Sequence, residues 1–134
     1  MKNKGFTLIE LLAVIVILAI IALIATPMIL GVIDTAKRGS AESSALGYVE
    51  AVEKSSLIAV IDEGAQYADG TYTVDGKTIT SSSTSYTIDY KGDTATGTLT
   101  IANGEVTSAE LTFAKIHANT VDYTPANGAV IRES

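Results

Sequence analysis

The chain has 134 residues, contains no cysteine and carries a formal net charge of −6. This length fits one small domain with an added segment, and the lack of cysteine excludes disulfides and thiolate metal sites. The acidic balance argues against electrostatic binding of nucleic acid, which needs clustered lysines and arginines. It also argues against a polybasic surface that binds membranes. Any folded domain here must therefore be held together by packing alone.

The N-terminal segment is apolar. Lys2 and Lys4 precede Gly5, Glu10 is the one acid, and the 23 residues from Leu11 to Ile33 carry no charge. As a helix these 23 residues span ~35 Å, which is enough to cross a hydrocarbon core of ~30 Å. A secretory signal peptide has a shorter apolar core that ends in small residues. We therefore expect a membrane-spanning helix, with the basic leader in the cytoplasm and the remainder outside.

The run KGFTLIE, followed by the long apolar stretch, resembles the processing site of type IV prepilins and pseudopilins. In that family a peptidase cuts after the glycine and methylates the new N-terminal residue. The resemblance implies cleavage between Gly5 and Phe6 and N-methylation of Phe6. It assigns Glu10 to the family's acidic position, where the carboxylate neutralises the terminal amine of its own chain or of a neighbour. It also assigns Pro27 to the place where the helix can loosen in a filament.

A simpler reading of Glu10 is also open. A carboxylate in the first turn complements the positive end of the helix dipole, an effect worth about 0.3–1 kcal/mol. This reading needs no second chain and no processing.

The apolar helix is expected to continue as an amphipathic one. Between Asp34 and Ile61, small and apolar residues recur at intervals of three or four, and most charged residues fall off that stripe. No turn signal intervenes, so we predict one helix from about Phe6 to Ile61, bent at Pro27. Its apolar stripe is formed by Ala41, Ala45, Val49, Val52 and Ala59.

Three glycines recur every eight residues in this helix: Gly31, Gly39 and Gly47. Each lowers helix propensity by ~1 kcal/mol relative to alanine. Close approach of another helix is one reason to keep them, and helix flexibility is the other.

After Gly64, which can cap the helix, the periodicity changes to two and β-branched residues become frequent. Asp75-Gly76 predicts a two-residue hairpin, which would place Val74 opposite Lys77 and Tyr72 opposite Ile79. The next strand, 85–90, is expected to pair with 95–101 through a turn at 91–94.

Asn103-Gly104 predicts a second hairpin, into the strand 105–114. Regular pairing would turn Leu111 and Phe113 outward, so we predict a β-bulge near Thr107-Ser108 that returns them to the face of Leu99. Further along, 121–124 is a candidate strand and 125–128 a turn.

Together these elements predict an α+β protein: one long helix whose second half packs on an antiparallel meander of about three to five strands. We divide the chain into a leader (1–5), an apolar half-helix for the membrane or filament core (6–33), an amphipathic half-helix (34–61) and a β-rich head (62–134). The resemblance implies the same architecture, known as the pilin fold.

The residues that could carry chemistry are few. His117 is the only histidine, and no P-loop, G-x-S-x-G or H-E-x-x-H motif is present. The loop carboxylates could suit calcium, but they lack the D-x-D-x-D-G spacing. They are Asp62, Glu63, Asp69, Asp75, Asp89 and Asp93. We therefore expect no enzyme, no metal and no cofactor.

The resemblance implies a structural subunit of a type IV pilus, with adhesion, motility or aggregation as outputs. The chain would wait in the cytoplasmic membrane, be processed by the prepilin peptidase and methyltransferase, and join identical copies at an inner-membrane assembly platform. The alternatives are a pseudopilin of a type II secretion or DNA-uptake system and, less favoured, a membrane-tethered binding module. We expect no direct contact with nucleic acid.

Overall fold

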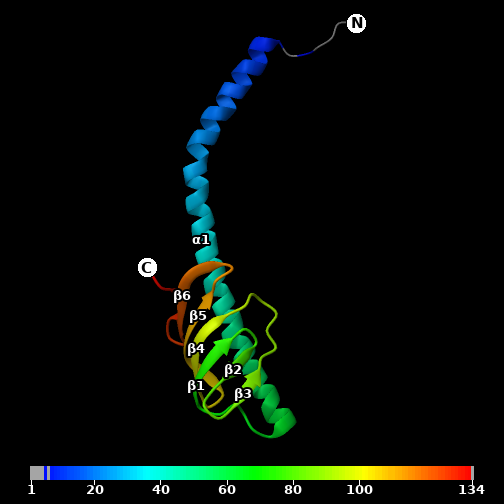
Figure 1. Cartoon of the computed structure of the whole chain (residues 1–134), viewed down its shortest axis with the longest axis vertical. Coiled ribbons are helices and arrows are strands. Elements are labelled where there is room, and N and C mark those ends of the chain that lie inside the picture. The colour runs from blue at the N-terminus through cyan, green and yellow to red at the C-terminus, as the bar shows by residue number, and fades with distance from the viewer. Residues whose placement is uncertain (1–4, 6, 134) are drawn as a thin grey trace. The chain divides into compact units, whose positions relative to one another are not determined.

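The computed structural model describes residue 5 and residues 7–133 and contains one helix followed by a seven-stranded antiparallel sheet (Figure 1). Helix α1 runs without interruption through Pro27 and comprises 56 residues, Leu8–Glu63. It ends at Gly64, whose φ of +81° and N–H bond to the Val60 carbonyl (3.1 Å) are typical of a glycine cap. The single long helix predicted from the sequence is confirmed.

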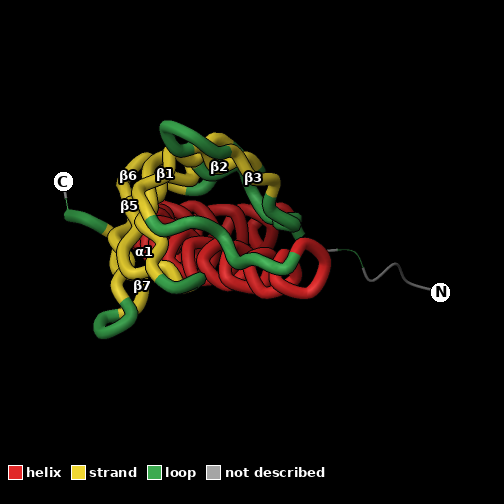
Figure 2. The backbone as a smooth tube through the Cα atoms, turned by 90° about the horizontal axis from the view of Figure 1, so that it is seen from below, coloured by secondary structure: helices red, strands yellow, loops and turns green. Residues whose placement is uncertain are grey.

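The chain divides into two compact units, Met1–Ala36 and Lys37–Ser134. The described part of the first unit is the apolar portion of α1, in which nearly every residue is exposed. In the second unit the remaining part of α1 packs against the sheet, which curves around one side of it (Figure 2).

The sheet has the order β3-β2-β1-β4-β5-β6-β7, so the predicted three to five strands were too few. The sequence had offered 121–124 only as a candidate strand and no strand after it, whereas β6 and β7 both form in this region, where the sequence pattern fades. The strands are β1 (Gly70–Asp75), β2 (Thr78–Thr80), β3 (Ser85–Thr87), β4 (Thr96–Ala102), β5 (Glu105–Phe113), β6 (His117–Thr124) and β7 (Gly128–Ile131).

The sheet is not a simple meander, and the predicted pairing of 85–90 with 95–101 is wrong. Strand β4 pairs with β1, from Gly70 opposite Ile101 to Asp75 opposite Thr96, and β3 pairs only with β2. Strand β1 offers β4 a six-residue ladder, whereas β3 comprises three residues. The longer ladder satisfies more backbone donors and acceptors.

The register of the first hairpin also differs from the prediction. Val74 lies opposite Ile79, and the turn is formed by Gly76 and Lys77, not by Asp75 and Gly76. The predicted register would turn Lys77 toward the core. The observed one places two buried apolar side chains opposite each other, and Gly76 (φ +62°) provides the positive φ of the first turn position.

The second hairpin follows the prediction. Asn103 and Gly104 both have positive φ, 55° and 79°, as a type I′ turn requires. Thr100 pairs with Ser108 and Ile101 with Val106, so Thr107 is the extra residue of a bulge. The bulge predicted near Thr107-Ser108 is therefore confirmed.

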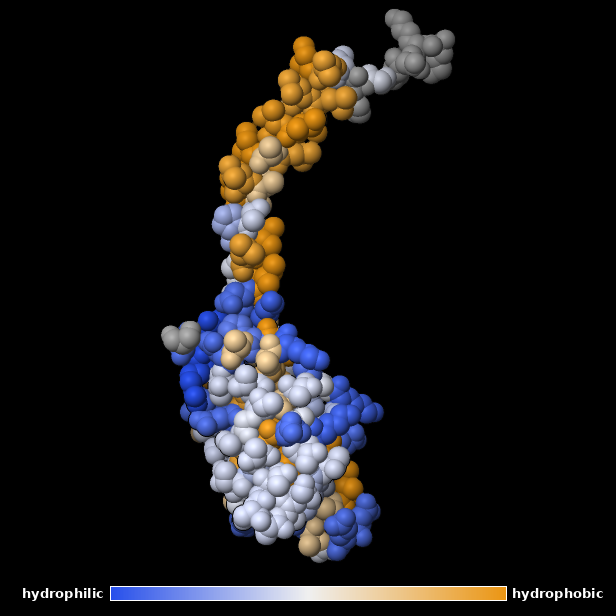
Figure 3. Space-filling model, viewed as in Figure 1, coloured by the Kyte–Doolittle hydropathy of each residue, from blue (hydrophilic) through white to orange (hydrophobic). Residues whose placement is uncertain are grey.

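The two faces of the sheet differ in chemistry. The inner face and α1 form one core, whose largest fully buried side chains include Tyr48, Tyr72, Leu111 and Phe113. The outer face is dominated by threonine and serine, and it forms the pale surface over the strands in Figure 3. Threonine suits a solvated pleated face because its branched side chain favours strands and its hydroxyl can meet water.

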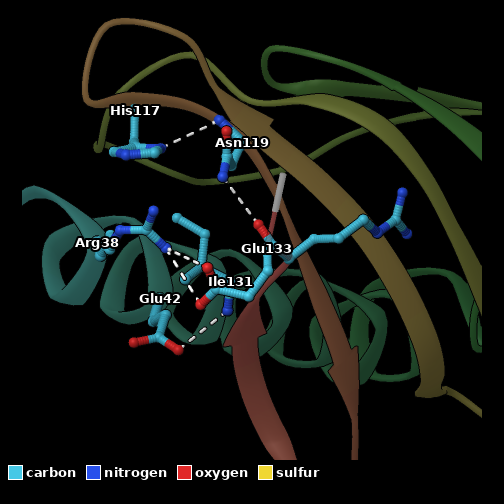
Figure 4. Close-up of polar contacts among 7 residues, drawn as sticks. Arg38, Glu42, His117, Asn119, Ile131 and Glu133 are labelled. Atoms are coloured by element: carbon cyan, nitrogen blue, oxygen red, sulfur yellow. Dashed lines mark hydrogen bonds and ion pairs between the residues drawn. The ribbon is translucent and has the colours of Figure 1, made fainter.

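Polar side chains on α1 fix the helix to the sheet. Glu53 accepts the Val106 N–H beside the bulge (3.1 Å), and the buried Ser56 hydroxyl accepts the Tyr67 N–H (2.9 Å). The Tyr48 hydroxyl donates to the Gly76 carbonyl (2.8 Å). Glu42 accepts the N–H of Ile131 on the edge strand β7 (3.0 Å; Figure 4). These bonds satisfy backbone N–H and C=O groups that have no partner in the pairing between strands.

Candidate processing and assembly region

A reciprocal pair of hydrogen bonds forms the start of α1. The Thr7 hydroxyl accepts the Glu10 N–H (3.2 Å), and the Glu10 carboxylate accepts the Thr7 N–H through Oε2 (3.1 Å). The Thr7 carbonyl accepts the first helical bond, from the Leu11 N–H (3.1 Å). This is a capping box, in which residues Ncap and N3 each satisfy a backbone donor of the other.

The capping box gives Glu10 a role within its own chain. Its carboxylate lies in the first turn, where it also complements the helix dipole. Within the described part of the chain its Oε2 accepts the Thr7 N–H, and a carboxylate oxygen can accept more than one donor.

The residues expected to be cut lie next to this box. Gly5 is exposed, lies outside the helix, and has nothing within 4 Å of where a Cβ would stand. Phe6, the predicted site of methylation, lies outside the described residues. A cut between Gly5 and Phe6 would thus leave one residue, Phe6, before the N-cap Thr7.

The apolar part of α1 has the length and composition to cross a membrane. Large side chains such as Leu23 (79 % exposed) and Met28 (70 %) have no cover within the chain. A helix that is apolar on all sides must be buried in lipid or among other helices.

Pro27 stands inside this helix, and the structure keeps the helix continuous on both sides of it. Proline cannot donate the usual backbone hydrogen bond one turn back. The preceding Thr26 hydroxyl donates to the Ala22 carbonyl (2.6 Å). Such a back-bond is common where threonine lies within a helix.

The described residues contain no group of three histidine or acidic side chains that could hold a metal ion. His117 lies at the start of β6, where its Nδ1 accepts the Asn119 N–H (3.1 Å; Figure 4). This contact gives it a part in the local structure of the strand.

Comparison with known families identifies the N-terminal region. Residues 1–26 match the family model of the prokaryotic N-terminal methylation motif, the class III signal peptide of type IV pilins. The match supports a pilin-like or pseudopilin-like protein, a class of structural, membrane-anchored proteins. Searches of the curated proteins and of the solved structures found no significant match.

Sequence reasoning missed Thr7 and the polar residues that fix α1 to the sheet. The spacing Thr7-x-x-Glu10 is itself the signature of a capping box and could have revealed the helix start. No comparable signal marks Glu42 or Glu53, because their partners lie 89 and 53 residues away along the chain.

Proposed function

We propose that this chain is a pilin, a structural subunit of a type IV pilus. The observation that carries the proposal is the methylation motif at residues 1–26 on an exposed apolar helix joined to a folded head. The leader, 1–5, would be removed by the prepilin peptidase. Phe6 would become the methylated N-terminus, and copies would assemble at an inner-membrane platform into a surface filament.

In this proposal the apolar segment, 6–33, has two successive environments. It lies in the cytoplasmic membrane before assembly and among the same segments of other copies afterwards. The contact between copies is heterologous and does not close, which generates a helical filament. The amphipathic segment, 34–61, and the β-rich head, 62–134, would remain outside the membrane, and Pro27 would let the helix loosen in the filament.

Glu10 would serve the terminal amine that cleavage creates. A cation and an anion buried together among apolar helices compensate each other, whereas removing one partner costs about 3–5 kcal/mol. The capping box supports this role because it already holds the carboxylate at the start of the helix.

Two substitutions separate the charge of Glu10 from its capping role. Glu10→Gln keeps a capping-box residue but removes the charge, and Thr7→Ala keeps the charge but removes the cap hydroxyl. We expect Glu10→Gln, like Glu10→Val, to abolish surface filaments seen by electron microscopy, and Thr7→Ala to reduce them less. Normal filaments from both Glu10 variants would refute the charge role.

The same motif also occurs in pseudopilins of secretion and DNA-uptake systems. Antibody labelling against the head distinguishes the two. A pilin labels long extracellular filaments of the producing cell at its native expression level, and a pseudopilin does not.

A further inference from the structure

The sheet has two edges, and only one of them is covered. At the β7 edge, the N–H of Ile131 points away from β6 and is bound by the carboxylate of Glu42 (3.0 Å). At the opposite edge, β3 pairs with β2 alone. An uncovered strand edge presents backbone donors and acceptors that another chain can pair with.

The register of β3 shows which of its backbone groups are free. The N–H of Ile88 donates to the Lys77 carbonyl (2.6 Å), and the N–H of Ser81 donates to the Thr84 carbonyl (2.7 Å). In an antiparallel pair with this register, the N–H and C=O groups of Ser85 and Thr87 point away from β2. Within the described part of the chain these outward groups have no hydrogen-bond partner.

A groove of about 370 Å³ lies between this free edge and the last turns of α1, at the end of the head where β3 is seen in Figure 1. Tyr67 and Tyr86 line it and stack on each other, with ring centroids 3.8 Å apart and planes 12° from parallel. The Ser55 hydroxyl on α1 accepts the Asp89 N–H (3.4 Å) and so fixes the chain after β3 to the helix. The groove is therefore formed by ordered residues before any ligand enters.

The charges along the groove have one sign. Asp62 and Glu63 line it from the end of α1 and Asp89 lines it from the chain after β3, whereas no lysine or arginine does. All three carboxylates are exposed, and none takes part in an ion pair among the described residues. Carboxylates beside aromatic rings suit a lysine or arginine side chain, because the rings attract the cation and the carboxylates accept its N–H groups.

We propose that this groove binds an extended peptide segment of a partner protein, and that the segment carries a lysine or arginine. The segment lies along β3 as an added strand and pairs with the outward groups of Ser85 and Thr87, a mode known as β-strand addition. Its basic side chain reaches the three carboxylates. Because only two residues of β3 offer outward groups, the backbone contact is short and the charge provides the selectivity. The site lies in the head and does not depend on the proposed filament.

A second copy of the chain is a poorer occupant of this edge. Pairing two β3 edges would bring together the same three carboxylates from each copy, and like charges facing each other across strands are destabilising. A basic segment removes this repulsion instead of adding to it.

The first test uses an acetylated and amidated peptide of about six residues, the ordinary length of a strand. It alternates threonine and valine around one central arginine, and the control peptide has glutamate in place of the arginine. With the detergent-solubilised full chain, the arginine peptide should slow amide hydrogen exchange at Ser85 and Thr87 by about tenfold or more. The glutamate peptide should bind at least about tenfold more weakly by fluorescence anisotropy, and added salt should weaken the arginine peptide. Unchanged exchange at both residues, or equal affinities, would overturn the proposal.

The second test removes the charge of the groove. Asp62→Asn combined with Asp89→Asn should lower the affinity for the arginine peptide by about tenfold. The matched control, Asp75→Asn combined with Asp93→Asn, removes two exposed carboxylates that do not line the groove and should bind as the unsubstituted chain does. Equal affinities of the two double variants would show that the groove does not select a cation.

The third test removes one backbone donor. Thr87→Pro deletes the outward N–H and keeps the pairing with β2, and proline is tolerated on edge strands in this orientation. It should weaken the arginine peptide, whereas Thr87→Val, which keeps the N–H, should not. Equal binding by these two variants excludes strand addition; if Thr87→Pro does not fold, the exchange and carboxylate tests decide. Exchange at Ser85 and Thr87 that slows with chain concentration, without any peptide, would assign the edge to a second copy and overturn the proposal.

Discussion

Apolar residues occur along the whole of α1, but its two parts bury them differently. From Leu8 to Ala36 nearly every residue is exposed, on all sides of the helix. From Ala41 to Ser56 one side of the helix is buried against the sheet. The first part therefore depends on an environment outside the chain, and the second part depends on the fold.

Because of this difference, substitutions in the two parts should affect different properties of the protein. A change in the core of Lys37–Ser134 should alter the free energy of unfolding of a single chain. A change in the apolar part should alter insertion or assembly and leave that free energy nearly untouched. The experiments below test this contrast on the detergent-solubilised full chain.

The largest effect is expected from truncating a core aromatic. Phe113 is fully buried, so Phe113→Ala should lower the free energy of unfolding by about 3–5 kcal/mol. Leu23→Ala, at a position 79 % exposed, should leave it unchanged within error. Chemical denaturation followed by circular dichroism measures both, and equal losses would remove the contrast between the two parts.

A pair of glycine substitutions tests the same contrast, between the packed sheet and the exposed apolar part of α1. A Cβ at Gly97 would stand 1.9 Å from the Glu110 carbonyl oxygen, and its φ is +133°. Gly97→Ala should therefore cost about 2–4 kcal/mol of folding stability. Gly31→Ala, where nothing lies within 4 Å, should be neutral or stabilising. Thermal unfolding midpoints of the two variants compare them directly, and an undisturbed Gly97→Ala would show that the strands can separate locally.

All tyrosines lie in the second part of the chain, so alkaline pH should act there. Burial raises the pKa of Tyr72 to about 12, with nearby Tyr86 adding to the effect, and burial also raises the pKa of Tyr48. The unfolded chain then releases these protons from about pH 10, before the folded chain does, and stability falls as the pH rises.

For Tyr72 the free energy of unfolding is expected to fall between about pH 10 and 12, the interval between its pKa in the unfolded and in the folded chain. Denaturation curves at stepped pH should be constant up to about pH 9 and then decline, with a shallower decline for Tyr72→Phe. An identical decline in that variant would assign the pH dependence to other groups.

The smallest of these effects should come from the bonds between helix and sheet. Glu53→Ala leaves the Val106 N–H beside the bulge without its carboxylate partner and should cost about 1–3 kcal/mol. Glu50→Ala, on an exposed position of the same helix, is the control and should cost little. Hydrogen exchange at Val106 should rise only in Glu53→Ala; if exchange is unchanged, water replaces the carboxylate.

The elements predicted correctly from the sequence are those specified by residues that are close together in the chain. The helix follows from an unbroken periodicity, the Asn103-Gly104 turn from two residues, and the bulge from the need to keep Leu111 and Phe113 on one face. The strand order could not be read in this way. Whether β4 pairs with β1 or with the strand before it depends on competition between ladders, and the choice between Val74–Ile79 and Val74–Lys77 depends on the core that both strands cover.

The candidate site shows the same limit. Gly5, Phe6 and Glu10 were predicted as site residues because they belong to one short motif, and their roles stay predictions. Thr7 was overlooked although its spacing to Glu10 carries a signal.

The central claim is that the apolar segment is held by lipid only until other copies surround it. N-terminal mass analysis of protein sheared from the cell surface tests this most directly. We expect a chain that begins at N-methylated Phe6. Protein found only in the membrane fraction, still beginning at Met1, would contradict it.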